Sequence, residues 1–463
     1  MGEKKMTKIA KAIRASLIFL LTAVVLFSGL FGCAAQNTGT KGETSPSSET
    51  GTASYAAPEG YTLSRMVILS RHNIRSPLSG SGSTLGKMTT HEWTEWSAPT
   101  GELTLRGGMQ ETAMGQYFRQ YLVEQGLMPE NWQPSGEAVR FYANSMQRTI
   151  ATAQYFAAGL LPVANQTIEY HCDLGTMDPV FTPQLTYVDE AFCAQAMEEI
   201  AAMGGAQGLR GITAALQDHY RLLEKVLDFQ NSEYAKENGI TALPDDEPQI
   251  HLEVNKEPSV TGSLKTATSA SDALVLQYFE EPDDAKAAFG NALTWEQWCD
   301  IAHITDTYTT VLFTAPSVAV NVAHPLLMEL ESELTAQGRQ FSFLCGHDSN
   351  VASVLAALGV EDYALLESVS QETPIGCKLV FACWTGPDGG DYAEVSLVYQ
   401  TVEQLRGCRM LDLNNPPQKV KLSFAGLNAN ADGLYRLEDL LARFDEAICG
   451  YDVMTGARLG DAA

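Results

Sequence analysis

The chain has 463 residues and carries 30 Lys and Arg against 56 Asp and Glu, a formal net charge of -26. This excess of acid excludes nucleic acid as the expected partner, because nucleic-acid binding needs a strongly basic surface. Apolar residues make up 45% of the chain, which is ordinary for a globular protein and leaves enough material for a large core.

The first 32 residues have the composition of a signal peptide. A lysine-rich start precedes an apolar run from Ala15 to Gly32, and Cys33 follows directly. Leu30-Phe31-Gly32-Cys33 resembles a bacterial lipobox, with Phe as a departure from its usual pattern. We therefore expect residues 1–32 to be a lipoprotein signal peptide and Cys33 to be lipidated, which would hold the protein at the membrane in an extracytoplasmic location, at the cell surface or on the periplasmic side. An uncleaved membrane anchor is the alternative, because the apolar run is just long enough to span a bilayer.

Residues 33–60 are rich in Ser, Thr and Gly and contain few large apolar side chains. Such a segment cannot bury enough apolar surface to offset the entropy lost on ordering. We expect a flexible tether here, followed by the folded part of the chain from Tyr61 onward.

Three short apolar runs each lead into a polar loop. The runs at 66–69, 139–143 and 341–345 are rich in β-branched and aromatic residues, and they precede the stretches SRHNIRSP, NSMQRT and GHDSN. Helical patterns follow at about 107–124, 147–161 and 351–358. Repeated strand, loop and helix units predict an α/β fold with a mostly parallel sheet flanked by helices. In such sheets ligands bind beyond the carboxyl ends of the strands, which is where these three loops fall.

The middle of the chain, from 165 to 320, has mainly helical patterns and includes the acidic loop at 244–248. Strand patterns return at 378–384 and 393–399, and a helix is expected at 437–448. We therefore predict an α/β core made of residues 61–164 and 321–455, with residues 165–320 forming an inserted, mainly helical subdomain.

The polar loops contain side chains suited to an anionic ester. Arg71 and Arg75 offer planar, permanently charged groups that match phosphate oxygens, and His72 between them can attack phosphorus. Arg148 starts a predicted helix, where its guanidinium and the helix terminus could face the same anion. Each of these features alone is more often structural. Their combination at three strand ends favours a phosphate site, to which His347 could add a hydrogen-bond donor and Asp348 a proton for the leaving alkoxide.

RHNIRSP and GHDSN together resemble the two signatures of the histidine acid phosphatases, branch 2 of the histidine phosphatase superfamily. Asn73 stands where most members have Gly, a departure shared with the glucose-1-phosphatases of that branch. Further stretches resemble the same subfamily: GELTLRGG, ANSMQRTIATAQYF, MDPVF, ETPIGCKLVF and VYQTVEQLR. The resemblance covers roughly residues 60 to 450 and implies a phosphoglycerate mutase-like core.

The resemblance also implies a mechanism and its residues. His72 would be the nucleophile that forms a phosphohistidine, and Asp348 the acid that protonates the leaving oxygen. Arg71, Arg75, Arg148 and His347 would bind the phosphoryl oxygens. No metal or other cofactor is implied, and the expected partner is a small phosphorylated substrate.

Substrate choice is open between three possibilities. LQYFEE resembles a glucose-1-phosphatase segment whose glutamate faces the substrate, so Glu280 is the candidate specificity residue; a solvated acidic surface is the alternative. A phytase acting on inositol phosphates shares the same motifs. A lipoprotein that only binds sugar or phosphate is disfavoured, because binding alone requires neither His72 nor Asp348.

Nine cysteines are present, and eight remain when Cys33 is set aside. An even number in an exported protein permits disulfides without requiring them. Cys345 lies in an apolar run and is expected to be a buried free thiol. The absence of a CxxC motif and of paired histidines disfavours a zinc site.

Overall fold

A seven-stranded sheet is the centre of the computed structural model, which describes residues 57–80 and 82–456. The strand order is β2-β5-β1-β6-β7-β8, and β9 pairs with β7. The predicted signal peptide and Cys33 lie outside the described residues. The strands are β1 Thr62–Arg71, β2 Val139–Ala143, β5 Phe341–Gly346, β6 Lys378–Thr385, β7 Asp391–Tyr399, β8 Gln418–Lys421 and β9 Tyr435–Arg436.

The sheet is mixed, whereas the sequence suggested a mostly parallel one. Strands β1 and β2 both pair with β5 in parallel, as predicted from the three strand-loop-helix units. Strand β6 runs antiparallel to β1, and β7 is antiparallel to β6 and β8. The connection 386–390 between β6 and β7 is short enough to close a hairpin but too short for the long crossover that a parallel pair needs, which explains the antiparallel β6–β7 pair.

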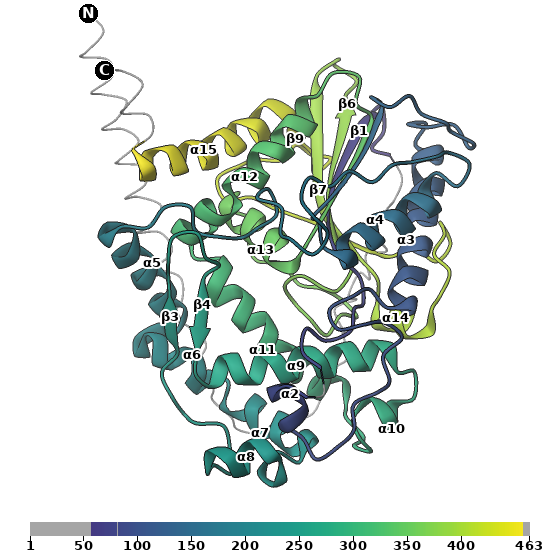
Figure 1. The fold of residues 1–463 in the computed structure, drawn as a ribbon. Helices are drawn as coiled ribbons and strands as arrows, with labels where there is room; N and C mark the ends of the chain where they lie inside the picture. Colours follow the sequence, from purple (N-terminus) through teal and green to yellow (C-terminus); the bar gives the residue numbers. More distant parts are fainter. Residues whose placement is uncertain (1–56, 81, 457–463) are drawn as a thin grey trace, which may run out of the picture. The chain divides into compact units, whose positions relative to one another are not determined.

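Helices cover both faces of this sheet (Figure 1). Along β1, Met66 and Ile68 pack in the cluster that includes α3 Leu105–Glu124 and α4 Gln147–Leu160. Val67 and Leu69 pack on the other face with α12 Pro316–Thr335, α13 Asp348–Ala357 and α15 Leu437–Thr455. Because side chains alternate along a strand and both faces are covered, β1 reads as a continuous apolar run.

The segment between α4 and α12 is mainly helical, as expected. Its apolar side chains form one cluster that also takes in Ile74 from the loop after β1, as well as Val318 of α12. The described residues belong to a single compact unit, so the division into a core and a subdomain at 165 and 320 stays a prediction. The elements of this segment are α5 Glu190–Met203, η1 Gly205–Gln207, α6 Leu209–Ala215, α7 Gln217–Leu227, η2 Phe229–Asn231, α8 Glu233–Asn238, β3 Gln249–His251, β4 Ser259–Thr261, α9 Ser263–Glu280, α10 Asp284–Ala287 and α11 Trp295–Phe313.

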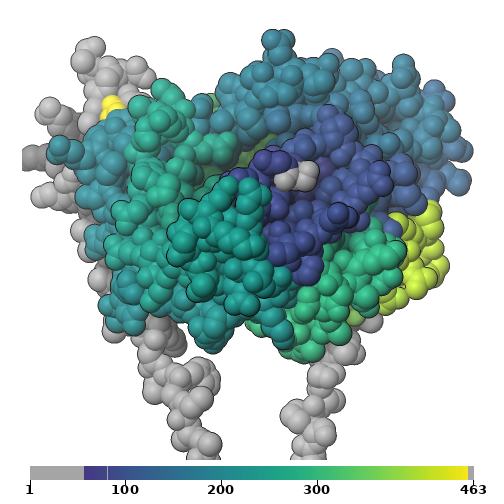
Figure 2. Space-filling view, turned by 60° about the horizontal axis from the view of Figure 1, so that its bottom comes forward, coloured from purple at the N-terminus to yellow at the C-terminus, as the bar shows by residue number. Residues whose placement is uncertain are grey.

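Two short helices complete the fold, α2 Thr84–Lys87 and α14 Val402–Gly407. The early segment with α2, purple in Figure 2, lies against the teal surface of the helical segment. In the part of the chain that the structure describes, no single helix is long and apolar enough to cross a membrane; only the bent pair α11 and α12 passes, by length and composition alone.

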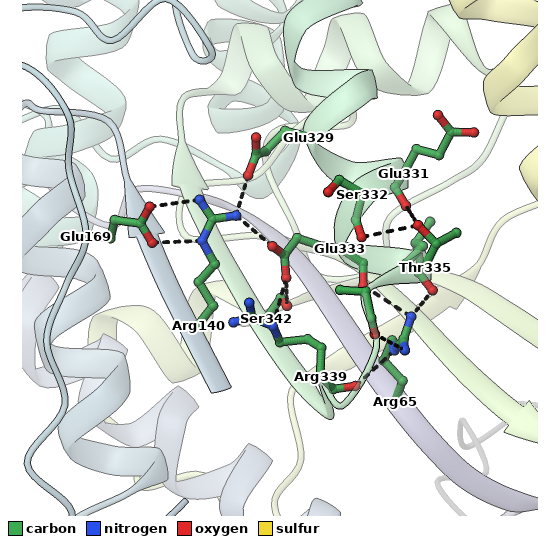
Figure 3. Close-up of polar contacts among 12 residues, drawn as sticks. Arg65, Arg140, Glu169, Glu329, Glu331, Ser332, Glu333, Thr335, Arg339 and Ser342 are labelled. Atoms are coloured by element: carbon green, nitrogen blue, oxygen red, sulfur yellow. Dashed lines mark hydrogen bonds and ion pairs between the residues drawn. The ribbon is translucent and has the colours of Figure 1, made fainter. Parts of the chain in front are cut away.

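A charged cluster fastens the edge strand β2 to α12 (Figure 3). The guanidinium of Arg140 donates to Glu169 at 2.8 and 2.9 Å and reaches Glu333 at 2.6 Å, and it also contacts Glu329. Charged side chains on an edge strand oppose pairing with another chain. This cluster therefore stabilises and protects the outer edge of the parallel part of the sheet.

The eight cysteines from Cys172 to Cys449 are free thiols in the structure. Cys345 is fully buried in β5, as predicted. Burial raises the pKa of its thiol, so it behaves as an apolar core residue.

Candidate active site

The three predicted loops meet at the carboxyl ends of β1, β5 and β2. In the parallel register Arg71 lies beside Gly346, so His72 and His347 follow neighbouring strand ends. Their ring centroids are 5.5 Å apart. Arg148 lies in the first turn of α4, and its Nη2 is 3.4 Å from His347 Nδ1. The structure thus brings together the side chains predicted from separate motifs.

The imidazole of His72 is held in a neutral form with one ring nitrogen available to act as a nucleophile. Its side chain is buried, and its Nδ1 lies 2.9 Å from the carbonyl oxygen of Asn73. That carbonyl can only accept, so Nδ1 carries the hydrogen and Nε2 keeps its lone pair. Burial holds the pKa of His72 well below its usual value, and Arg148 lowers it further. The imidazole therefore stays neutral under mildly acidic conditions.

Three guanidinium groups surround this histidine and have unused donors. The Nε atoms of Arg71, Arg75 and Arg148 are buried and have no hydrogen-bond partner within the described residues. An unpaired buried donor on a cation is costly unless a ligand satisfies it. Burial, with a contribution from Arg75, lowers the pKa of Arg148 to about 10, which still leaves it charged at neutral pH. The group has the charge and the free donors that a phosphoryl anion needs.

Two of these arginines are also held by carboxylates. Arg71 Nη2 lies 3.2 Å from Asp348 Oδ2 and its Nη1 donates to the carbonyl of Thr373. Arg75 Nη2 lies 3.1 Å from Asp272 of α9. These contacts fix the direction of both guanidinium groups before any ligand arrives.

Asp348 begins α13 and retains access to solvent, with 30% of its side chain exposed. Burial is the largest single effect and raises the pKa of its carboxyl, but Arg71, His347, Arg75 and the hydrogen bond from Ser349 N–H together lower the net pKa below the usual value. The carboxyl is therefore ionised in the empty site at neutral pH. A bound phosphoryl dianion beside it would raise its affinity for a proton, as an acid for the leaving group requires.

A buried ion pair supports the loop that carries His72, although no sequence pattern indicated it. Lys378 Nζ lies 2.8 Å from Glu111 Oε1, and both side chains are fully buried. The same oxygen accepts from Asn73 Nδ2 at 2.7 Å. Lys378 also donates to the carbonyl of Gly376, whose N–H bonds the carbonyl of His72. Asn73, the departure from the common motif, is thus the link between the nucleophile loop and this pair.

Close packing sets the position of the same loop. An added Cβ on Gly107, in the first turn of α3, would lie 2.3 Å from the carbonyl oxygen of Ile74. Only glycine permits that approach. Gly107, in the stretch GELTLRGG, is therefore required by the close approach of the loop that carries His72.

A cavity of about 490 Å3 lies between the strand ends and the helical segment, and its lining includes His72, Arg75, Arg148, His347 and Asp348. Helices α9 and α11 supply the facing wall, with Lys265, Asp272 and Tyr308, and Glu257 lies at its exposed rim. None of these four was singled out from the sequence, because each is an ordinary polar residue in a helical or loop pattern. The wall is polar and mixed in charge, as a hydroxyl-rich ligand would require.

The structure does not bring Glu280 to this cavity. Its carboxylate accepts hydrogen bonds from Thr104 Oγ1 at 2.8 Å and Ser97 Oγ at 3.2 Å, at the far end of α9. Asp272, which does line the cavity, precedes it by eight residues, or about 12 Å along a helix. The LQYFEE motif lies at the C-terminal end of α9. Glu280 is therefore too far along the helix to reach the cavity.

The fold and sequence have known relatives. Residues 62–399 match the model of the histidine phosphatase superfamily, branch 2. Glucose-1-phosphatase of Salmonella typhimurium is 38% identical, covering 82% of this chain and 91% of that protein. Phytase AppA of Escherichia coli is 30% identical, covering 83% and 92%. A phytase structure from Hafnia alvei superposes with a TM-score of 0.77 at 27% identity, covering 85% and 98%. By this match and these identities, the chain belongs to branch 2 of the histidine phosphatase superfamily.

Proposed function

We propose that the protein hydrolyses sugar monophosphates such as glucose 1-phosphate through a phosphohistidine on His72. Its family makes the chain a histidine-type acid phosphatase that acts on a small phosphorylated substrate. The observation that carries the assignment of the site is the neutral, buried His72 among three arginines with unused buried Nε donors.

The reaction has two steps. The Nε2 lone pair of His72 attacks phosphorus, a P–N bond forms, and the P–O bond to the sugar breaks while Asp348 gives its proton to the leaving oxygen. Water then attacks the phosphohistidine, the P–N bond breaks, and Asp348 takes the proton from the water. Arg71, Arg75 and Arg148 hold the equatorial oxygens and compensate their charge in both steps.

The composition of the cavity wall supports a sugar monophosphate. Glu257 and Asp272 place negative charge around the space where the leaving group would lie, and Lys265 is the cation contributed by that wall. Carboxylates accept hydrogen bonds from sugar hydroxyls and repel additional phosphates. A phytase acting on inositol phosphates is the second candidate, because relatives with that name share the fold and most of the chain.

A phosphate-release panel on the full chain tests this function. We expect glucose 1-phosphate to be hydrolysed with a higher kcat/KM than phytate, and an aryl phosphate to report the chemistry without dependence on the sugar. His72→Ala should lose nearly all turnover on every substrate, whereas His251→Ala, at an exposed position of β3, serves as the matched control. Normal turnover in His72→Ala would refute the nucleophile, and a preference for phytate would favour the second candidate.

We also propose an extracytoplasmic location with a lipid anchor at Cys33, supported by the apolar run before it and the Ser- and Thr-rich segment after it. Cys33→Ser should move the protein from the membrane fraction to the soluble fraction or block its processing. Cys193→Ser is the control for loss of a thiol elsewhere. Equal fractionation of wild type and Cys33→Ser would contradict the anchor.

A further inference from the structure

We propose that Asn144 is a positioning residue that holds His347 as the Nδ1–H tautomer, so that this N–H and Arg148 together donate to the phosphoryl group. The role in phosphate binding rests on the proposed function. Its geometry and its main test do not depend on turnover.

The orientation of the Asn144 amide is set from its far side. The residue is fully buried directly after β2, and its Oδ1 accepts the backbone N–H of Asp178 at 2.9 Å. Asp178 is held in turn by Tyr142, whose hydroxyl donates to its carboxylate at 2.9 Å. Turning the amide over would place two donors face to face in a buried place, which is costly. The amide nitrogen must therefore point away from Asp178.

That nitrogen meets the ring of His347. Nδ2 of Asn144 lies 2.7 Å from His347 Nε2 and 3.0 Å from Met177 Sδ, two acceptors. Nε2 has to present its lone pair to receive the bond, so in the neutral ring the hydrogen is on Nδ1. Oxygen and nitrogen of the amide are thus both satisfied by one tautomer of His347 and not by the other.

The second ring nitrogen, Nδ1, then carries a hydrogen. Among the described residues, none that contacts this nitrogen offers it an acceptor. Nδ1 lies 3.4 Å from Arg148 Nη2, and because a guanidinium can only donate, this contact alone would favour a lone pair on Nδ1. The contact from Asn144 to Nε2 is much shorter, at 2.7 Å, and therefore decides the tautomer. Both side chains line the cavity. Two neighbouring N–H groups that converge on a cavity suit an anionic oxygen, which can accept from both.

The surrounding charges favour the neutral ring. The cations of Arg148, Arg75 and Arg71 oppose a charge on His347, while Asp348 favours one. Burial is the largest effect, and the net pKa lies well below the usual value. His72 also faces the ring, and Glu257 and Asp272 border the same cavity. Protonation at Nε2 would in addition break the bond from Asn144, so the amide and the arginines act in the same direction.

Asn144→Asp gives the sharpest test, because it preserves shape and reverses polarity. One carboxylate oxygen still accepts from Asp178 N–H, while the other offers an acceptor to Nε2. We expect His347 to gain a proton at Nε2, and its pKa to rise. The matched control is Asn350→Asp, because the side-chain oxygen of Asn350 accepts the backbone N–H of His347 at 2.9 Å, a bond that a carboxylate can also accept.

The readout is a long-range 1H–15N NMR spectrum of the histidine rings, with His347 assigned from its loss in His347→Gln. We expect the Nδ1–H pattern in wild type and in Asn350→Asp, and a doubly protonated ring in Asn144→Asp at acidic pH. An Nε2–H pattern in the wild-type protein overturns the inference even if no variant folds. The spectrum is independent of catalysis, so it separates this inference from the proposed function.

Binding of inorganic phosphate supplies the functional arm. Asn144→Leu removes the bond to the ring, and we expect phosphate affinity to fall roughly 10- to 100-fold, the range for a hydrogen bond to a charged group. For phosphate ester substrates, we expect the variant to raise KM more than it lowers kcat. If the tautomer of His347 changes but phosphate affinity does not, His347 Nδ1–H is not a donor to phosphate. If both the Nδ1–H tautomer and the phosphate affinity are lost, the proposed role is supported.

Discussion

Lys378→Met should destabilise the protein in a pH-dependent way, because it leaves Glu111 buried without its cation. The pair is 2.8 Å apart and neither side chain is exposed. Removing one partner of a buried pair costs about 3–5 kcal/mol, a large part of the ~5–15 kcal/mol that holds a folded domain together. The perturbation therefore falls within the range that denaturant unfolding measures.

The pH dependence follows from Glu111. Burial raises the pKa of its carboxyl in the folded state, and Lys378 partly opposes that shift. Between its unfolded and folded pKa values the folded protein binds more protons, so its unfolding free energy falls as pH rises. Removal of Lys378 raises the folded pKa further and widens this window. The cost of Lys378→Met should therefore be small near pH 4 and grow toward neutral pH, by at most ~1.4 kcal/mol per pH unit.

The assay measures the free energy of unfolding in urea at several pH values. It compares wild type, the single variant Lys378→Met and the double variant Glu111→Gln/Lys378→Met. The double variant has no charge left at this pair and keeps an acceptor for Asn73, so it should be more stable than the single variant at neutral pH. Lys419→Met is the control, since Lys419 pairs with the buried Glu394, which keeps Lys421 as a second partner at 2.7 Å. A cost for Lys378→Met that does not change with pH would refute the buried carboxylate.

Three further predictions concern catalysis. Asp348→Asn should reduce turnover of an alkyl phosphate far more than that of an activated aryl phosphate, since only the alkoxide needs a proton; equal losses would reassign Asp348 to binding. Arg71→Gln removes the main cation that lowers the pKa of Asp348, so the alkaline limb of kcat/KM should move to higher pH, and an unmoved or lowered limb would contradict this coupling. Glu257→Gln should raise phytate hydrolysis relative to glucose 1-phosphate at low salt, with less change at high salt, while Glu280→Gln outside the cavity should have the smaller effect; equal effects would argue against Glu257 as the selective charge.

The part of the site that lies on strand ends was predictable from the sequence. An apolar run that stops at Ser70 and another that stops at Gly346 place His72 and His347 at one edge of a sheet, whatever the order of the other strands. The supporting residues gave no such signal. Glu111 lies in a helix where glutamate is common, and Lys378 starts a strand, so neither indicates that they meet across 267 positions of sequence.

The facing wall was harder to predict for a geometric reason. A helix turns by about 100° at each residue, so only the packing of α9 decides whether Asp272 or Glu280 faces the cavity. The mixed character of the sheet has a similar origin. For β6 and β7, the direction of pairing depends on the short connection 386–390. The alternation of apolar residues in a strand does not itself indicate whether the strand pairs in parallel or antiparallel.

The contact between Arg75 and Asp272 has a consequence for product release. The carboxylate at 3.1 Å already satisfies part of the arginine's charge, so an arriving phosphate replaces or shares an existing anion rather than filling an empty place. Under the proposed function, inorganic phosphate would therefore gain less from Arg75 than from an unpaired cation. Tight binding that is equal for substrate and product would lower KM without raising kcat. If Arg75 binds phosphate as proposed, we expect Asp272 to compete with phosphate for its guanidinium and so to favour product release.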